Sequence, residues 1–209
     1  MGNISNVIVS LGNHDINKDK KLKYYNKVDI LYNNFLDNMS KLNIKFLNNS
    51  VYEDKNVRFV GFNLPINCYN KENSLEFENI FYNSLDTDLF LGNDNKINIA
   101  IIHNPMNVCN DSILKKLCNF DIILSGHMHN GLIFNFIDKI FNGNRGIIDP
   151  EKKPFPKYAR NSVDIGNNKH LVISGGITKL SKTSGIFRFG DILYPMEIDQ
   201  VNIKKKIKK

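Results

Sequence analysis

The 209-residue sequence has no tryptophan, two alanines and three cysteines, and it lacks any long apolar run. The last absence excludes a membrane-spanning helix. No basic segment followed by an apolar stretch occurs near the start, which argues against a secretory signal. Because Cys68, Cys109 and Cys118 match no zinc-knuckle spacing, we interpret them as reduced thiols that act as small buried hydrophobes. These features predict a soluble, cytoplasmic protein.

The net charge of +7 raises the question of a nucleic-acid partner. The abundance of Asn, Lys and Ile with so little Ala indicates an AT-rich coding sequence, which raises the lysine content everywhere. Much of the excess charge lies in the tail IKKKIKK at 203–209. The aromatic residues fall mostly in apolar segments, and no nucleic-acid motif is present. We therefore expect no specific nucleic-acid binding and a solvated basic tail at 201–209.

Hydrophobic patterning predicts a single α/β domain over residues 1–200, a layered sandwich of mixed β-sheets flanked by helices. Several buried strands are short β-branched runs that stop at glycine or at a turn signal. Strands are expected at 6–12, within 44–64 around turns at 48–49 and 55–56, at 96–103, 120–129, 169–176 and 185–198, with helices at 29–42, 75–85 and 110–119 and a Gly/Asn/Pro-rich loop at about 142–162.

Four of the five histidines follow directly after an apolar segment. In open α/β sheets, ligands bind at the carboxyl ends of the strands, where these four side chains are expected. Neutral imidazole is a common protein ligand for zinc and also suits iron. The fifth, His170, begins its strand, and we interpret it as structural or solvent-facing. The pattern therefore predicts a metal site built from some of His14, His103, His127 and His129.

The stretch SGHMHNG at 125–131 places two histidines one residue apart. If the chain is extended there, the α-carbons of His127 and His129 lie roughly 6 to 7 Å apart. Paired catalytic metals lie about 3.5–4 Å apart, so the two imidazoles could flank a metal pair, one on each ion. A single ion is the other interpretation, although such sites more naturally use histidines four apart on a helix.

Three motifs occur in a fixed order: GNHD at 12–15, a histidine that ends a later strand at His103, and GHMH at 126–129. Together they resemble the calcineurin-like metallophosphoesterase superfamily over essentially residues 6–198. The stretches at 143–160 and 173–176 resemble a bacterial branch of membrane-associated or cytosolic members. The resemblance implies hydrolysis of phosphomonoesters or phosphodiesters by a hydroxide that a dinuclear metal centre activates.

The resemblance also assigns metal ligands. Asn13, His103 and His127 would bind the second metal, and His129 would bind the first. Such ligands suit a divalent pair of Mn, Fe or Zn.

Two further residues of the GNHD motif receive catalytic roles from the resemblance. His14 would face the substrate phosphate and stabilise or protonate the departing oxygen. Asp15 would hydrogen-bond His14 and fix its tautomer and orientation. A carboxylate-oriented imidazole is a common proton donor near neutral pH.

The sequence also departs from the family pattern. No Asp-x-His triplet occurs in it, and its only Gly-Asp pair is Gly190-Asp191. We interpret the chain as N-terminally truncated, missing the first strands, with the first metal site incomplete and little activity of its own. Any membrane association would depend on the missing segment. The alternative is a catalytically impaired remnant, or a metal-binding or interaction module that pairs with a separate N-terminal piece.

Basic residues in the loop after GHMH could contact a phosphate. The other interpretation of Arg145, Lys157 and Arg160 is that they are charges on an exposed loop.

Overall fold

The structure is a computed structural model. It describes residues 7–12, 37–38, 41–42, 44–64, 79, 83, 85–105, 111–132, 144–149, 154–176 and 199–203. Within these ranges, no helix is long and apolar enough to cross a lipid bilayer.

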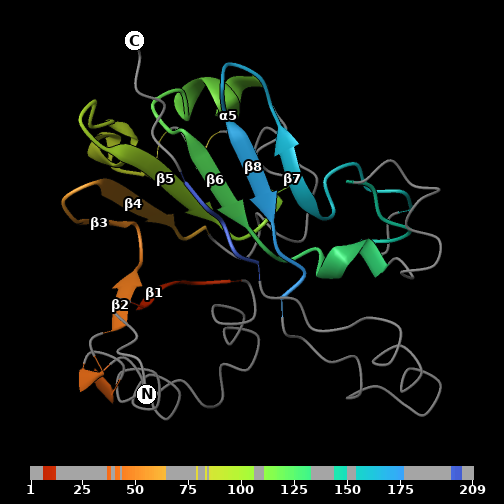
Figure 1. Cartoon of the computed structure of the whole chain (residues 1–209), viewed down its shortest axis with the longest axis horizontal. Helices are drawn as coiled ribbons and strands as arrows, with labels where there is room; N and C mark the ends of the chain where they lie inside the picture. Colours follow the sequence, from red (N-terminus) through yellow and green to blue (C-terminus); the bar gives the residue numbers. More distant parts are fainter. Residues whose placement is uncertain are drawn as a thin grey trace.

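In the described part of the chain, six strands form one mixed sheet (Figure 1). The four inner strands are parallel, and each edge strand is antiparallel to its neighbour. This arrangement confirms the predicted mixed α/β architecture and places the carboxyl ends of the inner strands at one edge. In spatial order the strands are β3 (Ser50–Glu53), β4 (Val57–Phe62), β5 (Ile97–Ile102), β6 (Ile122–Ser125), β8 (His170–Ile173) and β7 (Asn161–Asp164).

Two further strands, β1 (Val7–Ser10) and β2 (Ile44–Leu47), form a separate parallel pair. This pair packs against β4 at Gly61, where a β-carbon would overlap the β-carbon of Leu47 and lie 3.2 Å from the Oγ of Ser10. Glycine is therefore required at this position, because any side chain would push the two sheets apart. The contact brings the end of β1 next to the carboxyl ends of the inner strands.

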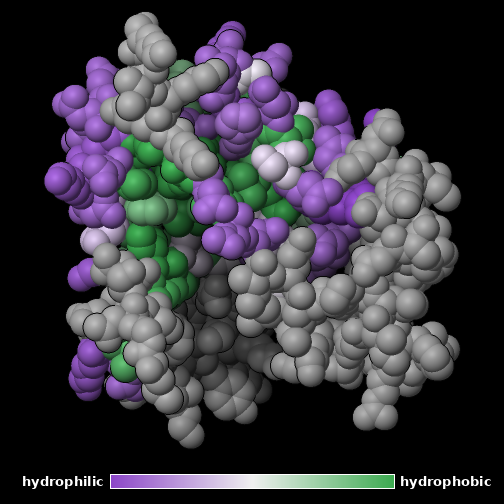
Figure 2. Space-filling model, in the orientation of Figure 1, coloured by the Kyte–Doolittle hydropathy of each residue, from purple (hydrophilic) through white to green (hydrophobic). Residues whose placement is uncertain are grey.

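The hydrophobic core lies on one face of the six-stranded sheet. Phe62 of β4 is fully buried, and its ring stacks on Phe90 with centroids 5.2 Å apart and meets Phe120 edge-on at 5.8 Å. Ile113 of α5 (Asp111–Lys116) joins the same cluster, as does Phe90 of the 3₁₀ helix η2 (Thr87–Phe90). Figure 2 shows hydrophobic residues gathered over the middle of the molecule, with hydrophilic residues around them.

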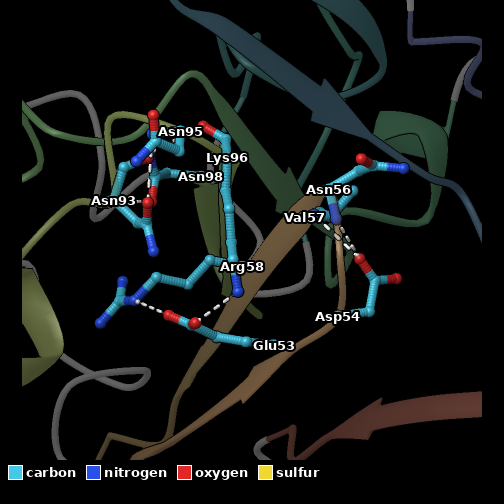
Figure 3. Close-up of polar contacts among 9 residues, drawn as sticks. All are labelled: Glu53, Asp54, Asn56, Val57, Arg58, Asn93, Asn95, Lys96 and Asn98. Atoms are coloured by element: carbon cyan, nitrogen blue, oxygen red, sulfur yellow. Dashed lines mark hydrogen bonds and ion pairs between the residues drawn. The ribbon is translucent and has the colours of Figure 1, made fainter.

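The amino ends of β4 and β5 carry a polar network (Figure 3). Arg58, which is buried, approaches the carboxylate of Glu53 at 3.1 Å, and the Nζ of Lys96 approaches the other carboxylate oxygen at 2.6 Å. Arg58 also donates to the carbonyl oxygen of Asp88 at 3.2 Å. Residues that are distant in sequence are thus joined at the end of the sheet away from the histidines.

Most predicted elements that fall on described residues are confirmed. The three strands within 44–64 flank both predicted turns, and β5, α5, β6 and β8 lie within their predicted ranges. The strand β7 was not predicted, since it begins inside the expected loop. The strand expected at 120–129 was predicted too long, because β6 ends at Ser125.

Other expectations fall mainly outside the described residues. Only Asp37, Asn38 and Lys41 are seen as helical within 29–42, and only Asn79 and Asn83 within 75–85. The predicted strand at 185–198 lies outside altogether.

One cysteine contradicts the sequence-based interpretation. Cys118 is exposed, not buried. It lies just past the end of α5, in a surface turn where Lys169 donates to its carbonyl oxygen.

Candidate metal site at the strand ends

Two of the predicted ligands follow neighbouring parallel strands. His103 comes directly after β5, and His127 follows two residues after β6. The backbone N–H of Gly126 donates to the carbonyl oxygen of His103 at 3.0 Å, which ties the two strand exits together. The parallel register of β5 and β6 therefore determines that these histidines meet at one edge of the sheet.

The imidazole rings of His103 and His127 lie with their centroids 5.0 Å apart and their planes inclined at 67°. His127 is buried, with 6% of its surface exposed, and His103 is half-buried. Two imidazoles this close, at least one of them shielded from water, form a compact pair of nitrogen donors at the end of the sheet.

The chain does not continue as a strand through the histidines. The N–H of Met128 donates to the carbonyl oxygen of Gly126 at 2.7 Å, and His127 between them has φ = 66°. A three-residue turn with a positive central φ is a rare and strained γ-turn. Such strain in a non-glycine residue is often found at functional sites, where the surrounding structure must impose it.

A second turn follows at once. The N–H of Gly131 donates to the carbonyl oxygen of Met128 at 2.7 Å, with φ = 46° at His129 and φ = 56° at Asn130. Two successive positive φ values are typical of a type I′ turn. We refer to residues 126–131 as the histidine turn. The expectation of an extended chain between His127 and His129 was wrong, so the separation derived from it does not apply.

The histidine turn is anchored in the core by Met128, which is fully buried and belongs to the main hydrophobic cluster. Its burial fixes the turn against the core between His127 and His129. His129 is half-buried.

Gly12, the first residue of the GNHD motif, packs on the ring of His103. A β-carbon at Gly12 would lie 2.7 Å from Cε1 and 2.9 Å from both ring nitrogens of His103. The end of β1 therefore reaches the histidine pair, and only glycine leaves room for the imidazole. Sequence reasoning overlooked this role, although a glycine directly before Asn13 was its visible signal.

The spacing of His103 and His127 meets one geometric requirement for a shared divalent ion. Because a zinc–nitrogen bond is about 2.1 Å long, an ion lies roughly 3.2 Å from the centroid of an imidazole that binds it. Two rings can therefore share one ion only when their centroids lie within about 6.4 Å of each other. The observed 5.0 Å meets this condition.

The remaining predicted site residues have different outcomes. Asn13, His14 and Asp15 lie outside the described residues, so their roles stay predictions. His170 is exposed at the start of β8, as expected. Among the residues that the structure describes, no three His, Cys, Asp or Glu side chains are grouped so that they could hold a metal ion. The pair thus needs further ligands to complete a coordination shell.

The loop after the histidine turn folds back onto it. The N–H groups of Ile147 and Ile148 donate to the carbonyl oxygen of Gly131 at 2.7 and 3.2 Å. Gly131 and Gly146 touch through their backbones, since a β-carbon on either would overlap the other residue. This segment therefore braces one side of the histidine turn.

The three basic residues of that loop divide into two groups. Arg145 and Lys157 are exposed, as the exposed-loop interpretation expects. Arg160 is buried, and its Nε donates to the carbonyl oxygen of Arg145 at 3.1 Å. The exposed-loop interpretation is wrong for Arg160, because this guanidinium ties two parts of the loop together.

The profile of the family described as calcineurin-like phosphoesterase matches residues 2–131. This match spans more than half of the chain and includes β1, β5, β6 and the histidine turn. No curated protein and no solved structure matches the chain.

Proposed function

This chain belongs to the calcineurin-like phosphoesterase family, and from that premise we propose that it binds a divalent metal through His103 and His127 and uses it to hydrolyse a phosphate ester. Metal-dependent hydrolysis of phosphate esters is the general activity of the family. The observation that carries the proposal for this chain is the 5.0 Å approach of the two imidazoles at the ends of β5 and β6.

The finer proposal is a dinuclear centre of Mn, Fe or Zn. His103 and His127, with Asn13, would hold the second metal, and His129 would contribute to the first. The contact between Gly12 and His103 supports including Asn13, because the two residues are adjacent in sequence. When bound, the metal supplies an activated water and positive charge against the phosphate oxygens.

The protein residues would have two tasks in this scheme. The buried imidazole of His127 and the half-buried His103 hold the centre at the sheet edge and limit the access of bulk water. His14, oriented by Asp15, would deliver a proton to the departing oxygen of the substrate. Both phosphomonoesters and phosphodiesters are compatible with this assignment.

Carboxylates for the first metal are scarce in this sequence. It holds no Asp-x-His triplet, and its only Gly-Asp pair is Gly190-Asp191. Bridging carboxylates offset the repulsion between two divalent ions, so neutral ligands alone bind a pair weakly. We therefore propose that the 209-residue chain by itself binds one ion more tightly than a second and hydrolyses phosphate esters slowly.

The test is a calorimetric titration of the purified chain with Mn²⁺. His103→Ala and His127→Ala should each weaken the tighter site by at least about tenfold, since changes to residues that merely support a ligand already cost this much. His170→Ala is the matched control, because His170 is exposed at the opposite end of a strand and should leave affinity unchanged. Unchanged Mn²⁺ affinity in the double His103→Ala/His127→Ala variant would exclude the proposed site.

Hydrolysis is measured on the same samples with an aryl phosphodiester. Rapid Mn²⁺-stimulated turnover by the chain alone, lost in His103→Ala, would disprove the slow-hydrolysis proposal and support a complete centre. Metal binding without turnover would instead favour the second candidate function, a metal-binding or interaction module, which the scarcity of first-site carboxylates supports.

A further inference from the structure

The exits of two paired strands meet beside the histidine turn. In the register of β6 and β8, Ser125 lies opposite Ile173, and the N–H of Ser174 donates to the carbonyl oxygen of Ser125 at 2.9 Å. Beyond this bond, the segment after β6 enters the histidine turn, and the segment after β8 continues to Gly175. The sheet therefore holds Gly175 at a fixed distance from the turn.

The side chain of Asn130 lies directly on the α-carbon of Gly175. A β-carbon at residue 175 would overlap the Nδ2 and Cγ of Asn130 and lie 2.5 Å from its Oδ1. No residue other than glycine fits there unless Asn130 moves. Asparagine is itself suited to its position, because it tolerates the left-handed backbone (φ = 56°, ψ = 20°) better than most residues.

The contact between Asn130 and Gly175 is steric and does not involve a hydrogen bond to the Oδ1 of Asn130. The Oδ1 of Asn130 is buried and has no hydrogen-bond partner in the described part of the chain. A buried amide oxygen without a partner is uncommon in proteins and calls for an explanation. The close packing against Gly175 holds the amide in this position.

The other side of the histidine turn is equally constrained. Gly131 is pressed against the backbone of Gly146, and a β-carbon there would also lie 2.7 Å from Ala159. Its carbonyl oxygen accepts hydrogen bonds from two neighbouring backbone N–H groups. If the backbone of Asn130 shifts, Gly131 has no room to follow it, so the shift is directed toward His129.

We propose that Asn130 and Gly175 form a steric lock that sets the direction of His127 and His129, so that Asn130 is a positioning residue for metal binding. The inference rests on the proposed function, because it concerns the same site. It adds Asn130 of the histidine turn and Gly175, just after β8, to the residues that orient His127 and His129. The strained γ-turn at His127 is the part of the turn that such a lock must maintain.

The lock is tested by adding a β-carbon at residue 175 and then removing the side chain of Asn130 that it would overlap. Gly175→Ala should lower Mn²⁺ affinity by about 10- to 100-fold, the usual effect of disturbing residues that orient metal ligands. Adding Asn130→Gly to that variant removes the overlapping amide and should raise the affinity to the level of Asn130→Gly alone. A double variant that binds no better than Gly175→Ala would overturn the lock.

Asn130→Gly alone is informative even if Gly175→Ala fails to fold. Glycine adopts a φ of 56° freely, so the melting temperature should not fall. Loss of the Asn130 side chain should still weaken Mn²⁺ binding several-fold, by less than Gly175→Ala does. An affinity equal to that of the wild type would overturn the proposal.

Gly92→Ala is the matched control. A β-carbon at Gly92 would lie 2.9 Å from the β-carbon of Asn119 and 3.3 Å from its carbonyl oxygen, a crowded glycine–asparagine contact near the end of α5. This variant should lower the melting temperature and leave Mn²⁺ affinity unchanged. If it weakens Mn²⁺ binding as much as Gly175→Ala does, general destabilisation explains both and the lock is excluded. Absence of Mn²⁺ binding by the wild-type chain would instead refute the proposed function.

Discussion

The imidazole of His103 rests against the α-carbon of Gly12, with ring atoms 2.7 to 2.9 Å from the position that a β-carbon would occupy. The segment that follows β1 thus contacts the histidine that follows β5, although 90 residues lie between Gly12 and His103 in the sequence. The side-chain position of His103, a predicted metal ligand, depends on the absence of a side chain at Gly12, directly before Asn13.

Gly12→Ala should therefore displace the imidazole of His103 from its present position beside His127. We expect Mn²⁺ affinity to fall by at least about tenfold, as for other changes that misplace a metal ligand. The measurement is a calorimetric titration alongside thermal unfolding.

The matched control for Gly12→Ala is Gly126→Ala. Its β-carbon would approach the same imidazole only to 3.8 Å, an ordinary van der Waals distance. Affinity should stay near that of the wild type. Equal losses in both variants would show that the close contact at Gly12 is not what positions His103.

Met128 should couple core packing to the metal site. Met128→Ala leaves a cavity in the core and should cost about 2–5 kcal/mol of unfolding free energy. It should also weaken Mn²⁺ binding, because the side chain anchors the histidine turn from within the core. Met128→Leu keeps the volume and should cost less than about 1.5 kcal/mol.

Leu117→Ala separates these two effects of Met128. Leu117 is as fully buried as Met128 and lies in the same cluster, next to α5. Its removal should destabilise the fold by a similar amount, about 2–5 kcal/mol, without a change in Mn²⁺ affinity of the folded protein. Matching affinity losses for the two alanine variants would contradict an anchoring role for Met128.

Arg160 should stabilise the loop that covers the histidine turn. Its buried Nε donates to the carbonyl oxygen of Arg145. Arg160→Met removes this hydrogen bond and leaves the carbonyl oxygen without that donor. We expect the free energy of unfolding to fall by about 1–3 kcal/mol. Amide hydrogen exchange should become faster at 144–149 and 154–160. Arg145→Gln and Lys157→Gln change exposed side chains and should stay within about 0.5 kcal/mol of the wild type.

How much could be predicted from the sequence depends on which interactions decide each feature. Strand positions follow from local hydrophobic patterning, which is why the three strands of 44–64 and their two turns were predicted correctly. The meeting of His103 and His127 was also predictable, because residues that follow neighbouring parallel strands share one edge.

Features set by tertiary contacts were not predictable. His127 has a left-handed backbone beside the buried Met128, and although histidine adopts positive φ more often than most residues, nothing in the local sequence requires it here. The burial of Arg160 depends on how the loop folds back, and the role of Gly12 depends on a ring from another strand. Positive φ values and close glycine contacts are therefore difficult to predict from a single sequence.

The ion network at the amino ends of β4 and β5 should make stability depend on pH in the acid range (Figure 3). The hydrogen bond from Lys96 is the largest cause that lowers the pKa of Glu53 below its ordinary value, and the positive charges of Lys96 and Arg58 add to it. A carboxylate with a lower pKa in the folded state stabilises the fold above its unfolded pKa, about 4.3, and loses that contribution as the pH falls through the folded pKa.

Glu53→Gln should therefore flatten the fall in unfolding free energy below about pH 4.3 and cost on the order of 1 kcal/mol at neutral pH, as expected for a partly exposed pair. Asp54→Asn is the comparison, because the pKa of Asp54 is lowered mainly by hydrogen bonds from the backbone N–H groups of Asn56 and Val57, at 2.8 and 2.9 Å. Salt at about 0.5 M should screen the contribution of Glu53 more than that of Asp54. Chemical unfolding at pH 3 to 7, with and without salt, gives both slopes, and equal salt sensitivity of the two would contradict the assigned causes.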